Sequence, residues 1–224
     1  MSTEAQIEEF VRGAGKLGIR LNESQVELFR TYLDEILAWN RRRKIVSRND
    51  EKRVAAYHFI DSLSALEVLP HKKGIKCLDL GSGAGFPGIP IKIARPDICL
   101  TLAEPKRWRY LFLEKVVEIL GLENTEVFRG RSEELSLSHP GHDVVFVRAV
   151  AKLGDAVSMA APLLCPGGIM IAFKSKDVGK EMNQALKPLL SSGAKVVCMK
   201  KVVLPLTGVT RLFVVIEKSH KLPS

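Results

Sequence analysis

The sequence predicts an α/β protein in which a mostly parallel, doubly wound sheet carries an antiparallel hairpin at one edge. Apolar side chains follow helical spacing over residues 1–70, which indicates an N-terminal helical extension. From residue 71 onward, short apolar runs alternate with helical segments, as in chains that build parallel sheets. Two β-rich runs around a Thr207-Gly208 turn close the chain and predict the hairpin. We therefore expect a helical extension over 1–70 and the sheet domain over 71–224.

The extension is expected to hold three helices. Ile7 and Phe10 belong to the first, and Asn22 is suited to cap the start of the second, which runs into Trp39. The third covers residues 54–68 and stops near Pro70.

The second part is expected to begin with five strands. They are placed at residues 76–80, 98–104, 125–128, 144–150 and 169–173. Helices are expected over 110–120 and 154–164, the latter broken by Pro166-Gly167-Gly168, and before Gly193. The hairpin strands are expected at 195–204 and 211–217.

Composition limits the class of protein. The 224 residues are 46% hydrophobic, so a sizeable core can form. No apolar stretch reaches the roughly 18 residues that a membrane span needs. The first ten residues are acidic and lack the apolar run of a secretory signal, so we expect a cytoplasmic protein.

The cysteines favour neither a disulfide framework nor a metal site. Four are present, widely spaced and without a C-x-x-C pair. We therefore expect no metal and treat these side chains as small core hydrophobes.

The charge balance points to a polyanionic partner. Thirty-four lysines and arginines against 25 acids give a net charge of +9. The densest cluster is the run Arg41-Arg42-Arg43-Lys44, with Arg48 nearby, which we expect to contact phosphates. A solvated helix end is the simpler alternative, because cations favour the C-terminus of a helix.

The sharpest motif is the glycine-rich segment from Asp79 to Pro90, which contains Gly81, Gly83 and Gly85. Glycines let a loop turn tightly and let a ligand approach the backbone closely. The segment follows the first strand, at the edge where open α/β sheets bind ligands. Glu104 ends the second strand, and a carboxylate at that point can hold both ribose hydroxyls of a nucleoside.

The spacing of the glycines distinguishes between nucleoside cofactors. A dinucleotide fingerprint, G-x-G-x-x-G, would need a glycine where Phe86 stands. The pattern here is D-x-G-x-G-x-G, which resembles the S-adenosylmethionine loop of Rossmann-like methyltransferases. That resemblance implies S-adenosyl-L-methionine as the cofactor and a class I methyltransferase fold.

The segment from Gly81 to Pro90, which ends F-P-G-I-P, resembles the signature of the bacterial 16S ribosomal RNA guanine-N7 methyltransferases, the glucose-inhibited division protein B family. Further matches lie in order along nearly the whole chain. They are Trp39-Asn40, His58, Asp61-Ser62, Arg109, Phe112-Leu113, Gly130 to Glu134, Arg148 to Ala151, Arg211 and Val214 to Glu217.

The sequence also departs from the family pattern. Arg41 to Ser47 replaces a short Asn-Leu-Thr-like segment, and Glu104 stands where the family usually has Asp. Trp108-Arg109 replaces a Lys-Arg pair, and Lys174-Ser175 replaces Lys-Gly. These departures affect the expected substrate contacts more than the cofactor site.

The resemblance implies a cofactor site that includes Gly81, Phe86, Ser132, Glu133 and Arg148. The loop chemistry adds Gly83 below the methionine part of the cofactor and Glu104 at its ribose. Ser132 and Glu133 follow the third strand and are expected at the adenine edge, although acids also favour an exposed helix start.

Arg148 and Lys174 are the expected catalytic residues, because they end the fourth and fifth strands at the same rim as the glycine loop. Solvated strand ends are the alternative. His58 and Asp61, one helical turn apart, are expected to fasten the helical segment to the sheet by hydrogen bonds.

The resemblance implies methyl transfer from S-adenosyl-L-methionine to N7 of a guanine in 16S ribosomal RNA, presented free or in the small ribosomal subunit. We expect a monomer that makes no membrane contact. Two alternatives stay open: a methyltransferase of small molecules, and a non-catalytic RNA-binding assembly factor. The +9 charge argues against the first, and the intact glycine loop argues against the second.

Overall fold

The computed structural model describes residues 2–139, 141–175 and 178–219. In these residues a seven-stranded sheet has the order β3-β2-β1-β4-β5-β7-β6. The strands are β1 (Lys76–Leu80), β2 (Cys99–Ala103), β3 (Thr125–Phe128), β4 (His142–Arg148), β5 (Leu164–Lys174), β6 (Ala194–Val203) and β7 (Thr210–Lys218). Strands β1 to β5 are parallel, and β7 is antiparallel to both β5 and β6. The expected fold class, with its edge hairpin, is confirmed.

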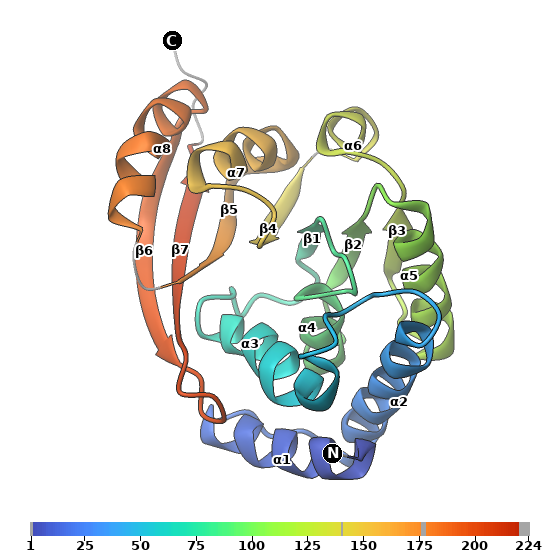
Figure 1. The fold of residues 1–224 in the computed structure, drawn as a ribbon. Coiled ribbons are helices and arrows are strands. Elements are labelled where there is room, and N and C mark those ends of the chain that lie inside the picture. The colour runs from blue at the N-terminus through green and yellow to red at the C-terminus, as the bar shows by residue number, and fades with distance from the viewer. Residues whose placement is uncertain (1, 140, 176–177, 220–224) are drawn as a thin grey trace.

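Helices cover both faces of the sheet (Figure 1). One face carries α1 (Thr3–Lys16), α2 (Glu23–Asn40), α3 (Ile60–Leu63), α4 (Gly88–Ala94) and α5 (Arg107–Ile119). The other carries α6 (Ser132–Ser138), α7 (Leu153–Ala160) and α8 (Gly179–Ser191). No helix of the described segments has both the length and the apolar character needed to cross a bilayer.

The first two helices follow the predicted pattern. Asn22 caps α2 by accepting a hydrogen bond from the Gln25 backbone N–H at 2.8 Å, and the Gln25 side-chain oxygen accepts the Asn22 N–H at 3.0 Å. Helix α1 reaches the turn of the β6–β7 hairpin, where Gly13 lies so close to Leu206 that a Cβ would approach it to 2.7 Å.

An aromatic cluster joins the N-terminal helices to the sheet. Phe10, Phe29 and Phe59 pack with ring centroids 4.5–5.5 Å apart, and Tyr32 stacks on Phe59 at 5.3 Å. All four side chains are fully buried. Burying a ring of this size stabilises the folded chain by about 2–3 kcal/mol. Residues 2–70 therefore share one core with the first face of the sheet.

The third helical segment is irregular. The sequence predicts one helix over 54–68, whereas the chain forms a π-turn at Ala55–Phe59, then α3, then a 3₁₀ turn at Ser64–Glu67. The Ser62 and Ser64 hydroxyls donate to the His58 and Asp61 carbonyls at 2.7 Å, and such bonds compete with a regular helical ladder.

The Pro166-Gly167-Gly168 segment was predicted to separate a helix from the fifth strand, and that prediction is wrong. Helix α7 ends at Ala160, and the segment lies inside β5. Leu164 pairs with His142 whereas Ile169 pairs with Val144, so the residues between them form a bulge. A proline is tolerated in such a bulge because no ladder bond needs its missing N–H. Cys165 is therefore part of this strand.

Candidate functional site

The glycine loop links β1 to α4 at the carboxyl end of the strand. Gly81, Gly83 and Gly85 have φ values of 76°, 61° and 93°, a region that residues with a Cβ rarely adopt. The loop is fixed to the neighbouring strand, because the Ala103 carbonyl accepts the backbone N–H groups of Gly81 and Ser82 at 2.9 and 3.0 Å.

The three glycines differ in the space beside them. A Cβ on Gly81 would lie 2.8 Å from Val150, and one on Gly85 would lie 2.4 Å from Ile89. A Cβ on Gly83 would meet no atom nearer than 3.9 Å. Gly83 is therefore the point at which a ligand has room to approach the loop.

Glu104 follows β2 and faces Gly83. Its carboxylate accepts the Gly83 N–H at 3.0 Å and the Lys106 N–H at 2.9 Å, and the Arg109 Nη1 lies 3.8 Å away. The residue is only 2% exposed. Because a carboxylate has about four acceptor positions, these contacts leave capacity for further hydroxyl donors.

Asp79, below the loop, is buried with half of its carboxylate unpaired. Its Oδ2 accepts the Gly88 N–H at 2.9 Å, whereas Oδ1 has no partner. Burial raises the pKa of Asp79 to about 7, against the lowering effect of the Gly88 hydrogen bond and of Arg148. Among the described residues, the only other buried side-chain atom without a hydrogen bond is the Arg109 Nε, beside the same loop.

Phe86 supports the loop from the side of the N-terminal helices. Its ring stacks on His58 at 4.8 Å and lies 5.9 Å from Tyr32, whose hydroxyl donates to the Ala84 carbonyl within the loop. The Arg148 guanidinium lies over the Phe86 ring at 5.6 Å. The aromatic cluster thus extends from the first two helices to the glycine loop.

Arg148 belongs to a buried charge cluster centred on Asp61. The Asp61 carboxylate, 1% exposed, accepts the Arg148 Nε–H at 2.9 Å and two N–H groups of Arg211 at 2.6 and 2.9 Å. This joins the third helical segment to β4 and β7, as expected for Asp61 from the sequence. Breaking such a pair costs about 3–5 kcal/mol, since it leaves a buried charge unpaired.

His58 completes the cluster as a neutral side chain. Burial and, to a lesser extent, the charge of Arg148 lower its pKa to about 4. Since arginine only donates, the 2.9 Å contact from Arg148 makes the His58 Nδ1 an acceptor and places the proton on Nε2, 3.6 Å from Asp50.

Lys174 lies at the carboxyl end of β5, beside β4, but its ammonium is already paired. It donates to Glu181 at 2.7 Å and to the Ala151 carbonyl at 3.1 Å. The same Glu181 carboxylate accepts the Leu153 N–H at 2.8 Å at the start of α7. Lys174 therefore connects α8 to the loop that follows Arg148, and its side chain is 11% exposed.

Ser132 and Glu133 stand in the first turn of α6. Ser132 is buried and Glu133 is exposed. The contacts in the described segments do not join either side chain to the glycine loop. Gly81, Gly83, Phe86, Glu104 and Arg148, by contrast, are brought together at the carboxyl ends of β1, β2 and β4.

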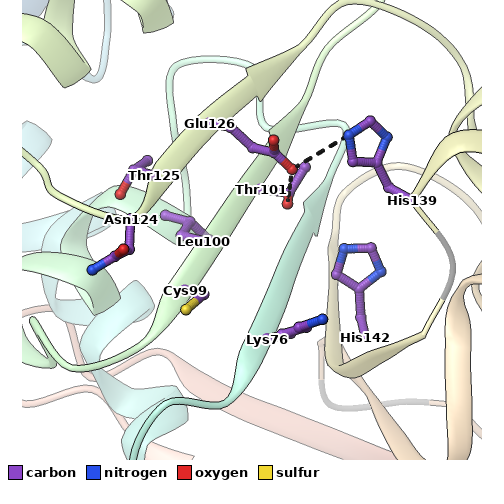
Figure 2. Close-up of a pocket in the computed structure, with 9 residues that line it drawn as sticks. All are labelled: Lys76, Cys99, Leu100, Thr101, Asn124, Thr125, Glu126, His139 and His142. Atoms are coloured by element: carbon purple, nitrogen blue, oxygen red, sulfur yellow. Dashed lines mark hydrogen bonds and ion pairs between the residues drawn. The ribbon is translucent and has the colours of Figure 1, made fainter.

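A cavity of about 560 Å³ lies at the opposite ends of these strands (Figure 2). It is lined by the first residues of several strands, including Lys76, Cys99 and His142. Glu126 accepts the Thr101 hydroxyl at 2.8 Å, with His139 at 3.7 Å. Because open α/β sheets bind ligands at their carboxyl ends, the glycine loop remains the candidate site.

Comparison with known proteins assigns the family. The family model described as rRNA small subunit methyltransferase G matches residues 25–210. This chain belongs to that family. A relative with the same name from Caldanaerobacter subterraneus is 36% identical over 99% of this chain and 93% of its own length. Another, from Bacillus subtilis, is 33% identical over 97% of this chain and 92% of its own length.

Solved structures show the same fold. TrmN from Thermus thermophilus has a TM-score of 0.54 at 18% identity, covering 70% of this chain and 48% of its own. TYW2 from M. jannaschii, solved with AdoMet, has a TM-score of 0.53 at 13% identity, covering 66% and 70%. The cyclase SpnF has a TM-score of 0.57 at 14% identity, covering 76% and 83%. Since one of the three is named a cyclase, the fold alone does not define the reaction.

Sequence reasoning did not identify all the residues around the loop. Tyr32 and Val150 contact it, and Arg211 pairs with Asp61. The sequence marks Val150 and Arg211 only as family matches and assigns no role to either. No local pattern marks Tyr32, because an apolar-face tyrosine on a helix is normally a core residue.

Proposed function

We propose that this methyltransferase transfers the methyl group of S-adenosyl-L-methionine to N7 of a guanine in 16S ribosomal RNA. The observation that carries the proposal is the intact glycine loop, whose Gly83 faces open space beside Glu104, in a member of a small-subunit rRNA methyltransferase family. A non-catalytic assembly factor would not need a glycine loop with open space beside a buried carboxylate.

The residues of the loop fit this cofactor. The Oδ1 of Asp79 and the Nε of Arg109 are buried without hydrogen bonds, which is costly unless a ligand completes the site. Glu104 retains acceptor capacity for ribose hydroxyls. We assign Gly81, Gly83 and Phe86 to the methionine side of the cofactor site, with Ser132 and Glu133 at its adenine edge.

The chemistry requires positioning more than proton transfer. Guanine N7 carries a lone pair and no proton, so its methylation needs no general base. The bound cofactor supplies an electrophilic methyl group on a sulfonium. What the chain must provide is an in-line approach of N7 and donors for the guanine O6.

Arg148 is our candidate for the O6 donor and for contact with the cofactor. Asp61 and His58 hold its Nε and Nη2, and in the described part of the chain no contact occupies Nη1. A guanidinium pinned in this way keeps a fixed donor at the rim of the glycine loop. Lys174 is the second catalytic candidate. Because it is paired with Glu181 and with the Ala151 carbonyl, the alternative is that it acts by positioning the 149–153 loop rather than by touching the substrate.

The substrate is expected to be a folded RNA rather than a plain duplex. A-form RNA hides its major groove, where N7 lies, so the enzyme must meet the guanine in a loop, an irregular junction or a flipped base. The net charge of +9 suits such a partner. We propose a cytoplasmic monomer that acts on ribosomal RNA, free or within the small subunit.

Methyl transfer from tritium-labelled cofactor tests the proposal directly. Incubation with small-subunit RNA, followed by nucleoside analysis, is expected to place the label in 7-methylguanosine. Calorimetry is expected to show micromolar cofactor binding, about −8 kcal/mol, and no binding of NAD. Label found only in small molecules, or at another base position, would refute the assignment.

A further inference from the structure

A groove of about 410 Å³ lies at the C-terminal end of α2, outside the candidate cofactor site. It is lined by Ala38, Trp39, Arg41, Arg42, Arg43 and Lys115. Its volume falls within the range of small-ligand pockets. One wall comes from the end of α2 and the residues that follow it, and the other from α5.

The groove carries positive charge that the protein does not neutralise. Arg41, Arg42 and Arg43 are exposed, and none of them has an acidic partner in the parts of the chain that the structure describes. Lys115 alone is paired, with Glu35 of α2 at 2.8 Å. Three adjacent guanidinium groups without counter-charges repel one another, and an anion bound between them would relieve that repulsion. The charges therefore indicate an anion-binding site.

Trp39 supplies a fixed aromatic wall. Its indole packs on Phe112 of α5 in a T-shaped arrangement, with ring centroids 5.5 Å apart and an interplanar angle of 70°. The side chain is half-buried against the core and also lines the groove. A ring held in this way offers a stacking surface at little further entropic cost.

We propose that this groove binds an unpaired nucleotide of the RNA substrate, with its base against Trp39 and its phosphates on Arg41, Arg42 and Arg43. An aromatic face beside cations is how single-stranded nucleic acid is held without sequence preference. An acidic peptide would match the charge but would bring no flat π face for Trp39. The inference rests on the proposed RNA substrate and adds a second contact point to it.

The groove lies close enough to the glycine loop to position the RNA substrate. Lys115 lies six residues after Arg109 on α5, so about 9 Å of helix separates the groove from the residue beside Glu104. A nucleotide held there would fix the RNA close to the rim at which the guanine reacts. The groove therefore sets the register of the substrate and takes no part in the methyl transfer itself.

The chain has only two tryptophans, which makes the stacking step measurable. In a Trp108→Phe variant, Trp39 is the sole indole, and its fluorescence reports on the groove. Titration with an eight-nucleotide oligouridylate is expected to quench it. An abasic oligomer of equal length and charge is expected to bind about tenfold more weakly and to leave the fluorescence unchanged. Equal binding and equal quenching by the two oligomers would overturn the stacking assignment.

Neutralising the arginines tests the phosphate contacts. Arg41→Gln, Arg42→Gln and Arg43→Gln together are expected to reduce the slope of log affinity against log salt by about 2, since each contact with single strands contributes about 0.7. The matched control replaces three exposed cations of the first helical region, Arg12, Lys16 and Arg20, with glutamine. An equal effect of both triple variants would show that only total charge matters and would overturn the proposal.

Competition with polyglutamate separates RNA from an acidic protein as the occupant. If polyglutamate displaces oligouridylate at equal charge concentration and quenches Trp39 equally, the nucleotide assignment is wrong. Failure of the parent function is distinguished by the methyl-transfer assay. If the wild-type enzyme methylates small-subunit RNA while the groove variants bind RNA normally, the nucleotide-binding role of the groove is refuted. The proposed methyltransferase function then stands.

Discussion

Each glycine of the loop has a different physical reason to be glycine. Gly81 and Gly85 lack room for a Cβ, because Val150 and Ile89 already occupy that position. Gly83 has the room, with the nearest atoms at 3.9 Å, so its Cβ-free backbone faces the space in which a ligand would lie. Substitution at Gly83 therefore tests the ligand site more directly than substitution at the other two.

Gly83→Val is expected to abolish cofactor binding while the protein stays folded. The added side chain fills the open space, and the left-handed backbone, φ 61°, costs about 1–2 kcal/mol in strain. Gly121→Val is the matched control, because Gly121 has φ 56° and open space but lies at the end of α5. Calorimetry with S-adenosyl-L-methionine and circular dichroism measure the two effects. Unchanged affinity in Gly83→Val would place the cofactor elsewhere.

At the residue scale, the sequence predicts the types of side chain better than their partners. The glycines and Glu104 could be found because their spacing along the chain is itself the signal. The partner of Asp61 could not, because Arg148 and Arg211 lie 87 and 150 residues away. Lys174 ends the fifth strand as the sequence predicts, yet its pairing with Glu181 of α8 depends on the packing of two elements that only the fold brings together.

At the scale of elements, the segment between β4 and α7 is held by contacts at both of its ends. Ala149 adopts φ 56° although it is not glycine, a conformation that costs free energy and persists only where its surroundings impose it. The preceding residue, Arg148, donates to the Asp61 carboxylate. On the other side of Ala149, Lys174 donates to the Ala151 carbonyl. The loop is therefore fixed at both ends.

Lys174→Ala is expected to slow single-turnover methyl transfer more than it weakens RNA binding. The variant removes the donor to Ala151 and leaves Glu181 without its cation, which now lowers the pKa of that carboxyl. Single-turnover kinetics and filter binding measure the two quantities. A larger loss of RNA affinity than of rate would exclude a role at the reacting base.

Glu181→Ala separates the two explanations for such a result. If Lys174 acts by positioning the 149–153 loop, Glu181→Ala slows methyl transfer to a similar extent, because it removes the acceptor of both the Leu153 N–H and the Lys174 ammonium. If Lys174 contacts the substrate, releasing it from Glu181 leaves the rate near that of the wild type.

The elements themselves followed local patterns closely, and their exceptions have physical causes. The capped start of α2 and the edge hairpin agree with the sequence because caps, turns and alternation are local signals. The prediction for the Pro166 segment fails because a proline and two glycines normally end an element. Here the β4–β5 register shift absorbs them, and register is a property of the pair of strands.

At the scale of the whole molecule, the largely buried His58 and the fully buried Asp79 make the stability depend on pH in opposite directions. His58 has a pKa of about 4 in the folded chain, below its ordinary 6.5, so the unfolded chain takes up a proton first as the pH falls. Stability is therefore lost between pH 6.5 and 4, by about 3 kcal/mol in all.

Asp79 has a pKa of about 7 against an ordinary 3.8, so the folded chain holds the extra proton. That contribution is present below pH 3.8 and is lost as the pH rises to 7, by about 4 kcal/mol.

Because these slopes oppose each other, each becomes visible only when the other group is removed. Asp79→Asn keeps an acceptor for the Gly88 N–H and is expected to make stability fall more steeply than in the wild type as the pH drops from 6.5 to 4. His58→Asn is expected to do the reverse, so that stability rises relative to the wild type as the pH drops from 7 to 4. Urea unfolding at half-unit pH intervals measures both curves, and the difference from the wild type cancels the contributions of the other acids. Variants that shift the curve equally at every pH would show that neither buried group titrates as its surroundings dictate.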